Sequence, residues 1–218
     1  MTTPLLPDWL DRLRNLAPAL LGAGGLYAAA TVAFGFSPET TDVGYAPEQP
    51  IPFSHRLHAG ELRIDCRYCH DTVERAAHAA IPPTATCMNC HARVRTESRH
   101  LALLRRNHAA GQPIPWIRVH DLPDHAYFDH SAHVGAGVGC VSCHGRVDRM
   151  DVVEQVEPLS MGWCLDCHRD PAPHLRPPER VTDMGWQPAE HGGRGTQDQL
   201  RHGRSARGAA QDCSACHR

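Results

Sequence analysis

The stretch Phe128-Asp129-His130-Ser131-Ala132-His133, followed after a glycine-rich gap by Cys140-Val141-Ser142-Cys143-His144, decides how this chain folds. The second half has the form CxxCH, and two cysteines three residues apart project from one side of a helical turn. Two such thiols can bond the two vinyl groups of one haem, while the adjacent histidine binds its iron. The first half, FxHxxH, supplies two further imidazoles that can bind iron on the opposite faces of haems.

The CxxCH signature occurs five times, and we number these sites in chain order: site 1 is 66–70, site 2 is 87–91, site 3 is 140–144, site 4 is 164–168 and site 5 is 213–217. They use every cysteine of the chain, namely Cys66, Cys69, Cys87, Cys90, Cys140, Cys143, Cys164, Cys167, Cys213 and Cys216. Zinc knuckles and disulfides also use CxxC pairs, but neither needs a histidine after the second cysteine. With His at 17 of 218 positions, all five would carry that histidine by chance about three times in a million. The sequence therefore predicts five covalently bound haem c groups.

Five six-coordinate irons need two axial ligands each. The CxxCH histidines, which we call proximal, supply one ligand per iron: His70, His91, His144, His168 and His217. The FxHxxH motifs supply four more: His55, His58, His130 and His133. In such motifs the first histidine commonly serves the haem just downstream, which assigns His55 to site 1 and His130 to site 3. We predict Met161 as the remaining ligand, with Met184, His120, His108 and His78 as alternatives, and a methionine ligand would raise the potential of its haem.

The chain contains an internal duplication. The FxHxxH motif and the first CxxCH motif of 53–91 recur in 128–168 at an offset of 74 or 75 residues, and Val73-Glu74-Arg75 recurs as Val147-Asp148-Arg149. The second CxxCH motif follows the first by 21 residues in one repeat and by 24 in the other. Each repeat thus carries two haem sites, and the fifth site, 213–217, is appended.

Composition limits the fold to one with little protein core. A haem-bearing region of 55–218 leaves about 33 residues per haem, too few for a separate apolar core around each. We therefore expect a multihaem cytochrome c fold, mostly irregular with short α-helices around five stacked haems. Residues 92–110 predict a helix and 116–120 a short strand. The Pro- and Gly-rich segment after His168 is expected to wrap the haems or tether the fifth.

Residues 16–36 form an uncharged run long enough to cross a bilayer of about 30 Å. A cleaved signal peptide, with Ala28-Ala29-Ala30 before the cut, is the alternative, but the run is longer than a usual signal core. Arginines precede the run and acidic residues follow it, which places 1–15 in the cytoplasm. Residues 37–54 then form a periplasmic linker, and 55–218 a pentahaem domain on the periplasmic side of the inner membrane.

The formal charge of −2 gives no indication of nucleic-acid binding. The chain has no lysine, so a lysine-ligated catalytic haem is excluded. All 22 basic residues are arginines, which form forked pairs with carboxylates such as haem propionates.

Two further runs complete an ordered set of motifs: Pro115-Trp116-Ile117-Arg118-Val119-His120-Asp121-Leu122-Pro123-Asp124 and Met161-Gly162-Trp163-Cys164-Leu165-Asp166-Cys167-His168-Arg169. Over 16–218 the chain resembles the pentahaem cytochrome c subunit of alternative complex III. The resemblance implies a membrane complex that oxidises quinol and reduces a periplasmic cytochrome c, high-potential iron–sulfur protein or copper protein. It also implies two partners: an integral membrane quinol-oxidising subunit and an iron–sulfur subunit.

We therefore expect an electron-transfer subunit of a respiratory or photosynthetic complex that is not an enzyme by itself. The alternative is a stand-alone, membrane-anchored multihaem quinol dehydrogenase that feeds a periplasmic reductase. That enzyme would need a quinol pocket and a base near the first haem, and Glu61 and Asp65 are the candidates.

Overall fold

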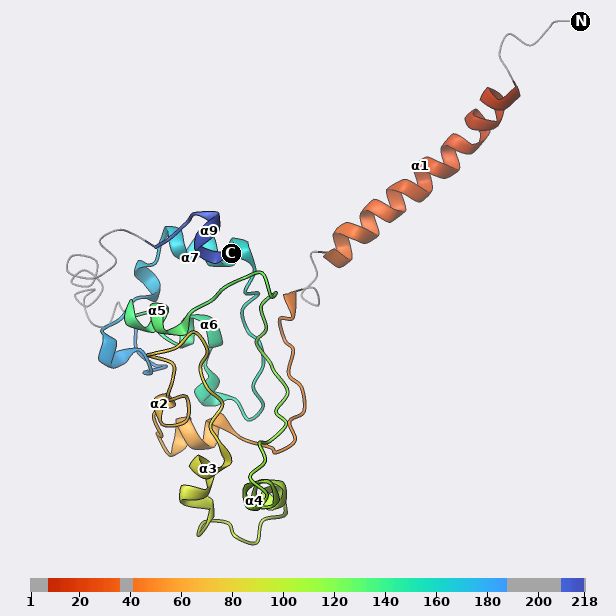
Figure 1. Cartoon of the computed structure of the whole chain (residues 1–218). Coiled ribbons are helices and arrows are strands. Elements are labelled where there is room, and N and C mark those ends of the chain that lie inside the picture. Colours follow the sequence, from red (N-terminus) through yellow and green to blue (C-terminus); the bar gives the residue numbers. More distant parts are fainter. Residues whose placement is uncertain (1–7, 36–40, 188–208, 218) are drawn as a thin grey trace, which may run out of the picture. The chain divides into compact units, whose positions relative to one another are not determined.

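The computed structural model describes residues 8–35, 41–187 and 209–217 (Figure 1). The chain divides into two compact units, Met1–Asp42 and Val43–Arg218.

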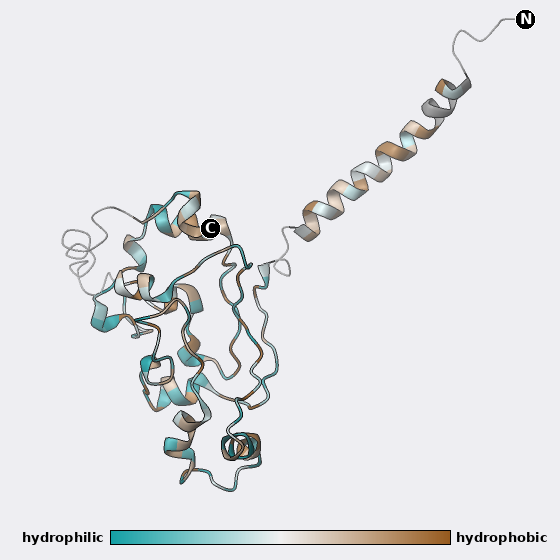
Figure 2. Ribbon diagram, viewed as in Figure 1, coloured by the Kyte–Doolittle hydropathy of each residue, from teal (hydrophilic) through white to brown (hydrophobic). Residues whose placement is uncertain are grey.

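The first unit contains one long helix, α1 (Asp8–Gly35). Its segment Leu16–Gly35 is long and apolar enough to cross a membrane, judged by length and composition. Figure 2 shows hydrophobic residues at intervals along Leu16–Gly35, and large side chains such as Leu21 and Phe34 are exposed. The helix begins eight residues before the predicted run, so Pro18 lies inside it.

The second unit consists of short helices in an otherwise irregular chain. The helices of the first repeat are η2 (Arg56–Glu61), α2 (Cys66–Cys69) and α3 (Thr84–His91), and η3 (Arg99–Leu101) and α4 (Ala102–Ala109) follow. The second repeat contains α5 (His130–Gly135), α6 (Val141–His144), η4 (Val147–Arg149) and α7 (Met161–Arg169). After it come η5 (Ala172–His174), η6 (Pro178–Arg180) and α9 (Cys213–Cys216). The described residues form no strand beyond an isolated bridge between Val138 and Leu175, which confirms the predicted fold of short helices with little sheet.

Two local predictions are wrong. The helix predicted over 92–110 is confined to η3 and α4, because Arg95 adopts a left-handed backbone conformation with φ of 52° that interrupts it. The strand predicted over 116–120 does not form. The side-chain amide of Gln49 takes the place of a neighbouring strand there: its Nε2 donates to the Ile117 carbonyl at 2.8 Å and its Oε1 accepts from the Ile117 N–H at 2.9 Å.

The Pro- and Gly-rich segment after His168 is only partly described. Its first part, to residue 187, forms 3₁₀ turns, as expected of an irregular segment. The part over 188–208, which we expected to wrap the haems or tether the fifth, lies outside the described residues.

The two repeats contact each other through η2 and η4. The Arg56 N–H donates to the Met150 carbonyl at 2.9 Å, and the Arg56 guanidinium binds Asp151. The backbones approach so closely that a Cβ atom on Gly60 would lie 2.2 Å from the Asp148 carbonyl oxygen. Glycine is therefore required at position 60 for the repeats to dock in this way.

The apolar core of the second unit is small. One cluster has Ile51, Leu104 and Ile114 at its centre, and partly buried side chains pack around them: Cys87, Met88, Leu101, Leu103 and Trp116. This cluster fastens α4 to α3, the helix that carries site 2. The protein thus uses apolar packing to hold the polypeptide beside one CxxCH site.

Replacing Leu104 tests this cluster, because its side chain is only 2% exposed. Leu104→Ala should lower the free energy of unfolding by about 2–5 kcal/mol through lost transfer energy and a residual cavity. The matched control Leu62→Ala removes a side chain that is 60% exposed and should change stability by less than about 0.5 kcal/mol. Guanidinium unfolding of the haem-loaded chain, followed by circular dichroism, measures both. Equal effects of the two substitutions would contradict the core assignment.

Candidate functional site

Three pairs of histidine rings face each other in the second unit. The ring centres lie 6.2 Å apart for His58–His91, 6.3 Å for His130–His144 and 5.9 Å for His133–His168. Metal–imidazole bonds are about 2 Å long, so two imidazoles on opposite faces of one iron have ring centres about 6 Å apart. Each pair combines one FxHxxH histidine with one proximal histidine. The side chains present therefore fit haem iron held between two histidines.

The FxHxxH motif positions its two histidines with a phenylalanine. Phe128 stacks on His133 at 4.4 Å between ring centres and meets His130 edge-on at 4.8 Å. Phe53 contacts His58 at 4.3 Å and His55 at 4.8 Å in the same way. One aromatic ring thus fixes both imidazoles of a motif, which explains why the phenylalanine belongs to the repeated pattern.

Helix α5 directs its two histidines to different CxxCH sites. The carboxylate of Asp129 caps the helix by accepting the Ser131 and Ala132 N–H groups. Within the helix, His130 faces the proximal histidine of site 3 and His133 faces that of site 4. In the first repeat His58 faces site 2, and His55 lies near enough to His70 of site 1 for their charges to interact. Each FxHxxH motif therefore reaches both CxxCH sites of its own repeat.

Hydrogen bonds fix the tautomer of most of these histidines. The Nδ1 atoms of seven histidines lie 2.5 to 3.1 Å from backbone carbonyl oxygens: His58, His70, His91, His130, His133, His168 and His217. A carbonyl oxygen can only accept, so Nδ1 carries the proton and Nε2 keeps its lone pair. This arrangement orients an imidazole for binding metal through Nε2 and raises its basicity.

Burial keeps several of the histidines neutral. Burial, followed by the charges of His120, His130 and other nearby histidines, lowers the pKa of His144 to about 3. Burial, with smaller effects from His70 and His58, lowers the pKa of His55 to about 4. Burial is also the main cause that lowers the pKa of His133. A neutral imidazole is the form that binds iron.

The cysteine thiols place the CxxCH sites in a spatial order. Burial raises the pKa of the Cys66 thiol to about 11, and the nearby Cys140 thiol adds to the rise, so sites 1 and 3 are neighbours. Burial also raises the pKa of the Cys69 thiol, and the nearby Cys87 thiol adds to the rise. Sites 1 and 2 are therefore neighbours.

The remaining thiols extend this order. Burial raises the pKa of Cys143 to about 12, and Cys167 and Cys164 contribute, so site 4 follows site 3. Burial and then Cys216 raise the pKa of Cys164, which places site 5 beside site 4. The resulting order is 2–1–3–4–5, with exposed cysteines, Cys90 and Cys213, in the two end sites.

Site 5 is anchored on site 4 and on the loop before α5. His168 of site 4 donates to the Ala210 carbonyl, and the Tyr127 N–H donates to the Cys216 carbonyl at 2.8 Å. His217 donates through Nδ1 to the carbonyl of His125 at 3.0 Å, and the two rings lie 5.5 Å apart.

His125 and His120 also lie close to proximal histidines. The rings of His125 and His217 are stacked at an interplanar angle of 26°. The His120 ring centre lies 4.5 Å from that of His144 at an interplanar angle of 80°, closer than two ligands on opposite faces of one iron would be. His125 belongs to neither motif, and nothing in its local sequence indicates contact with a residue 92 positions away.

The candidates for the tenth ligand differ in exposure. Met184 is 8% exposed and belongs to the buried interior, whereas Met161 is 67% exposed at the start of α7. Met161 precedes Cys164 by one helical turn, and Cys164 adjoins site 5. The ring of His108 contacts the Thr84 hydroxyl at 3.3 Å, and His78 is exposed. The assignment of Met161 stays a prediction.

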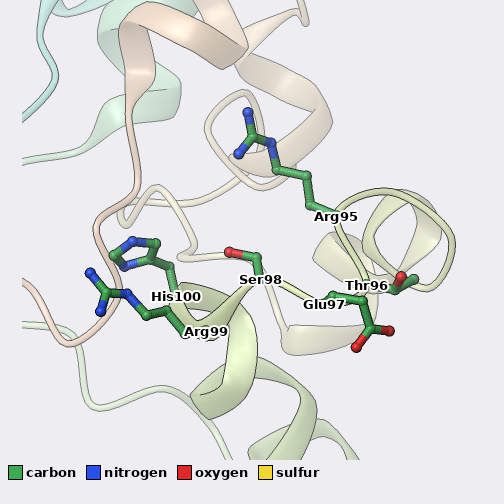
Figure 3. Close-up of a pocket in the computed structure, with 6 residues that line it drawn as sticks. All are labelled: Arg95, Thr96, Glu97, Ser98, Arg99 and His100. Carbon is green, nitrogen blue, oxygen red and sulfur yellow. The ribbon is translucent and has the colours of Figure 1, made fainter.

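A pocket with a volume of 530 Å³ lies apart from the histidine pairs (Figure 3). Six consecutive residues line it: Arg95, Thr96, Glu97, Ser98, Arg99 and His100. In Figure 3, Arg99 and His100 lie together while Glu97 points away from them. None of the predicted ligands lines it. Among the described residues, no three His, Cys, Asp or Glu side chains gather closely enough to hold a metal ion by themselves.

Comparison with known proteins finds a family match for part of the chain. Residues 126–218 match the family model of cytochrome c7 and related cytochrome c. This part of the chain, which holds sites 3 to 5, is thus similar to multihaem cytochromes c, proteins whose cofactor is covalently bound haem c.

A curated relative extends the comparison. Over 103 residues the chain is 33% identical to the multihaem cytochrome c subunit of menaquinone reductase from Nitratidesulfovibrio vulgaris strain Hildenborough. The match covers 47% of this chain and 48% of the relative. The chain thus spans about half the length of the curated relative that it matches.

Asp65 gives a prediction for the acid stability of site 1. Its carboxylate caps α2 by accepting the Arg67 N–H at 2.8 Å, and the bonds from Arg67 are the main cause that lowers its pKa to about 2. A carboxylate with a lowered pKa stabilises the fold above its ordinary value near 4, and the contribution is lost as pH falls through about 2. Asp65→Ala should cost about 1 kcal/mol at neutral pH.

Acid titration of stability provides the measurement. Between pH 4 and pH 2 the difference between wild type and Asp65→Ala should shrink towards zero. The control Asp71→Ala, at another exposed carboxylate of the same region, should show no such convergence. A constant difference down to pH 2 would rule out the capping role of Asp65.

Proposed function

We propose that this chain is an electron-transfer subunit of a quinone-linked membrane complex and carries five haem c groups. The observation that supports it best is the series of histidine pairs, each spaced for one iron and each beside a CxxCH site. When bound, haem c supplies one-electron redox chemistry. The chain itself is not an enzyme: its residues attach and ligate the haems and hold them in order.

We propose one pair of axial ligands for each site, and three of the five pairs are supported by facing histidine rings. His55 and His70 serve site 1, His58 and His91 serve site 2, His130 and His144 serve site 3, His133 and His168 serve site 4, and Met161 and His217 serve site 5. All ten cysteines form the thioether links. Two histidines saturate each of four irons and leave no open position for a substrate, which favours electron transfer over catalysis.

The spatial order of the sites gives the route. Electrons would enter and leave at sites 2 and 5, whose outer cysteines are exposed, while the central site 3 is the most enclosed. An exposed end lets a partner approach closely, and a buried centre excludes water from the interior of the route. Along this route, electrons would cross from the first repeat to the second between sites 1 and 3.

We assign the complex by resemblance to alternative complex III. The N-terminal helix would anchor the chain in the inner membrane with residues 1–15 in the cytoplasm, and 55–218 would face the periplasm. An integral membrane subunit would oxidise quinol beside an iron–sulfur subunit. The acceptor would be a periplasmic cytochrome c, high-potential iron–sulfur protein or copper protein.

The curated relative supports a second direction of transfer. It is named as a subunit of a menaquinone reductase, and a complex of that kind would carry electrons from the periplasm towards quinone. The same ordered haems serve either direction, because the direction is determined by the potentials of the donor and the acceptor. The experiment below distinguishes the two.

The arrangement argues against a stand-alone quinol dehydrogenase. Of the two nominated bases, Glu61 is paired with Arg56 at 2.7 Å and Asp65 is held by Arg67 at 2.9 Å. A carboxylate whose pKa is lowered to about 2 is a weak acceptor for a quinol proton. The quinol site therefore belongs to a partner.

Haem reduction by a quinol analogue tests the proposal. We expect the native membrane complex to be reduced at a catalytic rate, and the isolated chain in detergent to be reduced far more slowly. Equally fast reduction of the isolated chain, blocked by a quinol-site inhibitor, would overturn the proposal. If quinol does not reduce the complex but a low-potential periplasmic donor does, and added menaquinone reoxidises it, the direction is towards quinone.

The methionine ligand has its own spectroscopic signature. Wild type should show the near-infrared charge-transfer band of a methionine–haem bond, and Met161→His should lose the band and lower one of the five potentials. Met184→Leu, at the buried methionine, should keep the band. Its absence from wild type would show that Met161 is not a ligand.

A further inference from the structure

The loop over 77–80 contacts histidines from two different haem sites. The Ala80 carbonyl accepts a hydrogen bond from Nδ1 of His70 at 2.7 Å. The Ala77 carbonyl accepts one from Nδ1 of His130 at 2.8 Å. In the proposed ligand set, His70 is the proximal ligand in site 1 and His130 lies on the opposite face in site 3. One short backbone segment therefore orients ligands of two irons.

Thr72 holds this loop in place with a single hydroxyl. Its Oγ1 donates to the His78 carbonyl at 2.8 Å and accepts from the Ala80 N–H at 2.8 Å. These two bonds lie between the two carbonyls that orient the histidines. Thr72 itself is not one of the proposed ligands, and both hydrogen bonds of its hydroxyl go to the loop, so any effect it has on iron must act through the loop.

Backbone contacts fasten helix α5 to the same segment. The N–H of His130 donates to the Ala77 carbonyl at 3.1 Å, and the N–H of Ser131 donates to the Ala76 carbonyl at 3.3 Å. A shift of the loop would therefore move the start of α5 as well as the hydrogen bond on the His130 ring.

The second repeat has no equivalent of the Thr72 hydroxyl and its two hydrogen bonds. At the offset of 74 residues that relates the first CxxCH motif of each repeat, Thr72 corresponds to Arg146. The Arg146 guanidinium makes a forked pair with Asp148 at 2.6 and 2.8 Å. The repeats have thus diverged at this position, and the hydroxyl occurs in the repeat whose loop reaches across to the other.

We propose that Thr72 is a positioning residue for two irons at once: by holding the 77–80 loop it maintains the hydrogen bonds on His70 and His130, and so sets the potentials of the haems in sites 1 and 3 together. This inference rests on the proposed axial ligands. A hydrogen bond from Nδ1 to a carbonyl makes an imidazole a stronger donor to iron, which favours the ferric state and lowers the potential.

Thr72→Val removes the hydroxyl and keeps the shape of the side chain. In the full chain with its haems attached, two of the five midpoint potentials should rise together, while the other three stay unchanged. Thr72→Ser retains the hydroxyl and should keep all five at their wild-type values. Thr96→Val, in the exposed loop of Figure 3, is the matched control and should shift none. Redox titration followed by low-temperature EPR measures the potentials and resolves the ligand fields.

The outcomes separate this inference from the proposed function. A wild-type chain with fewer than five haems would refute the proposed function. Five haems with no shift, or with a shift of one haem only, would overturn the role of Thr72, as would a Thr72→Ser variant that behaves like Thr72→Val. If Thr72→Val fails to accumulate with its haems, Thr72→Ala removes the same hydroxyl without a branched side chain and is judged by the same criteria.

Discussion

The hydrogen bond from a histidine Nδ1 to a backbone carbonyl is the interaction on which the second unit depends. Seven histidines make it, and each bond leaves Nε2 directed to where an iron would lie. Five of the accepting carbonyls lie in turns and loops, whereas those of Ser54 and Asp129 also accept the backbone N–H of the same histidine at the start of a helix. A largely irregular chain is therefore suited to this task, because it leaves many carbonyl groups free to orient ligands.

A small protein core follows from the same constraint. Clusters such as Ile51, Leu104 and Ile114 hold the polypeptide only locally, so the apolar macrocycles must supply much of the remaining buried surface. The duplication uses the same motif twice. In each repeat, one phenylalanine and two histidines serve two CxxCH sites. Docking of η2 against η4, with Gly60 against Asp148, then brings the two pairs of sites into one series.

The sequence predicts the chemistry of the site better than its arrangement. The CxxCH and FxHxxH spacings are local, so the attachment residues and the pairing of His130 with site 3 can be inferred from the motifs alone. The order 2–1–3–4–5 and the place of His125 depend on contacts between distant segments and leave no local pattern. The strand expected at 116–120 does not form, because the Gln49 side chain bonds both the N–H and the carbonyl of Ile117. The late start of the helix predicted over 92–110, at Arg99 and not at residue 92, depends on the left-handed conformation of Arg95, which the sequence does not indicate.

The most direct test of the account is an experimental structure in which anomalous scattering locates each iron. We predict five irons, four of them between His55 and His70, His58 and His91, His130 and His144, and His133 and His168, and the fifth bound by His217. Their sequence through space should be sites 2, 1, 3, 4 and 5. Irons bound outside these histidine pairs, or a series in which sites 1 and 3 are not neighbours, would contradict the account.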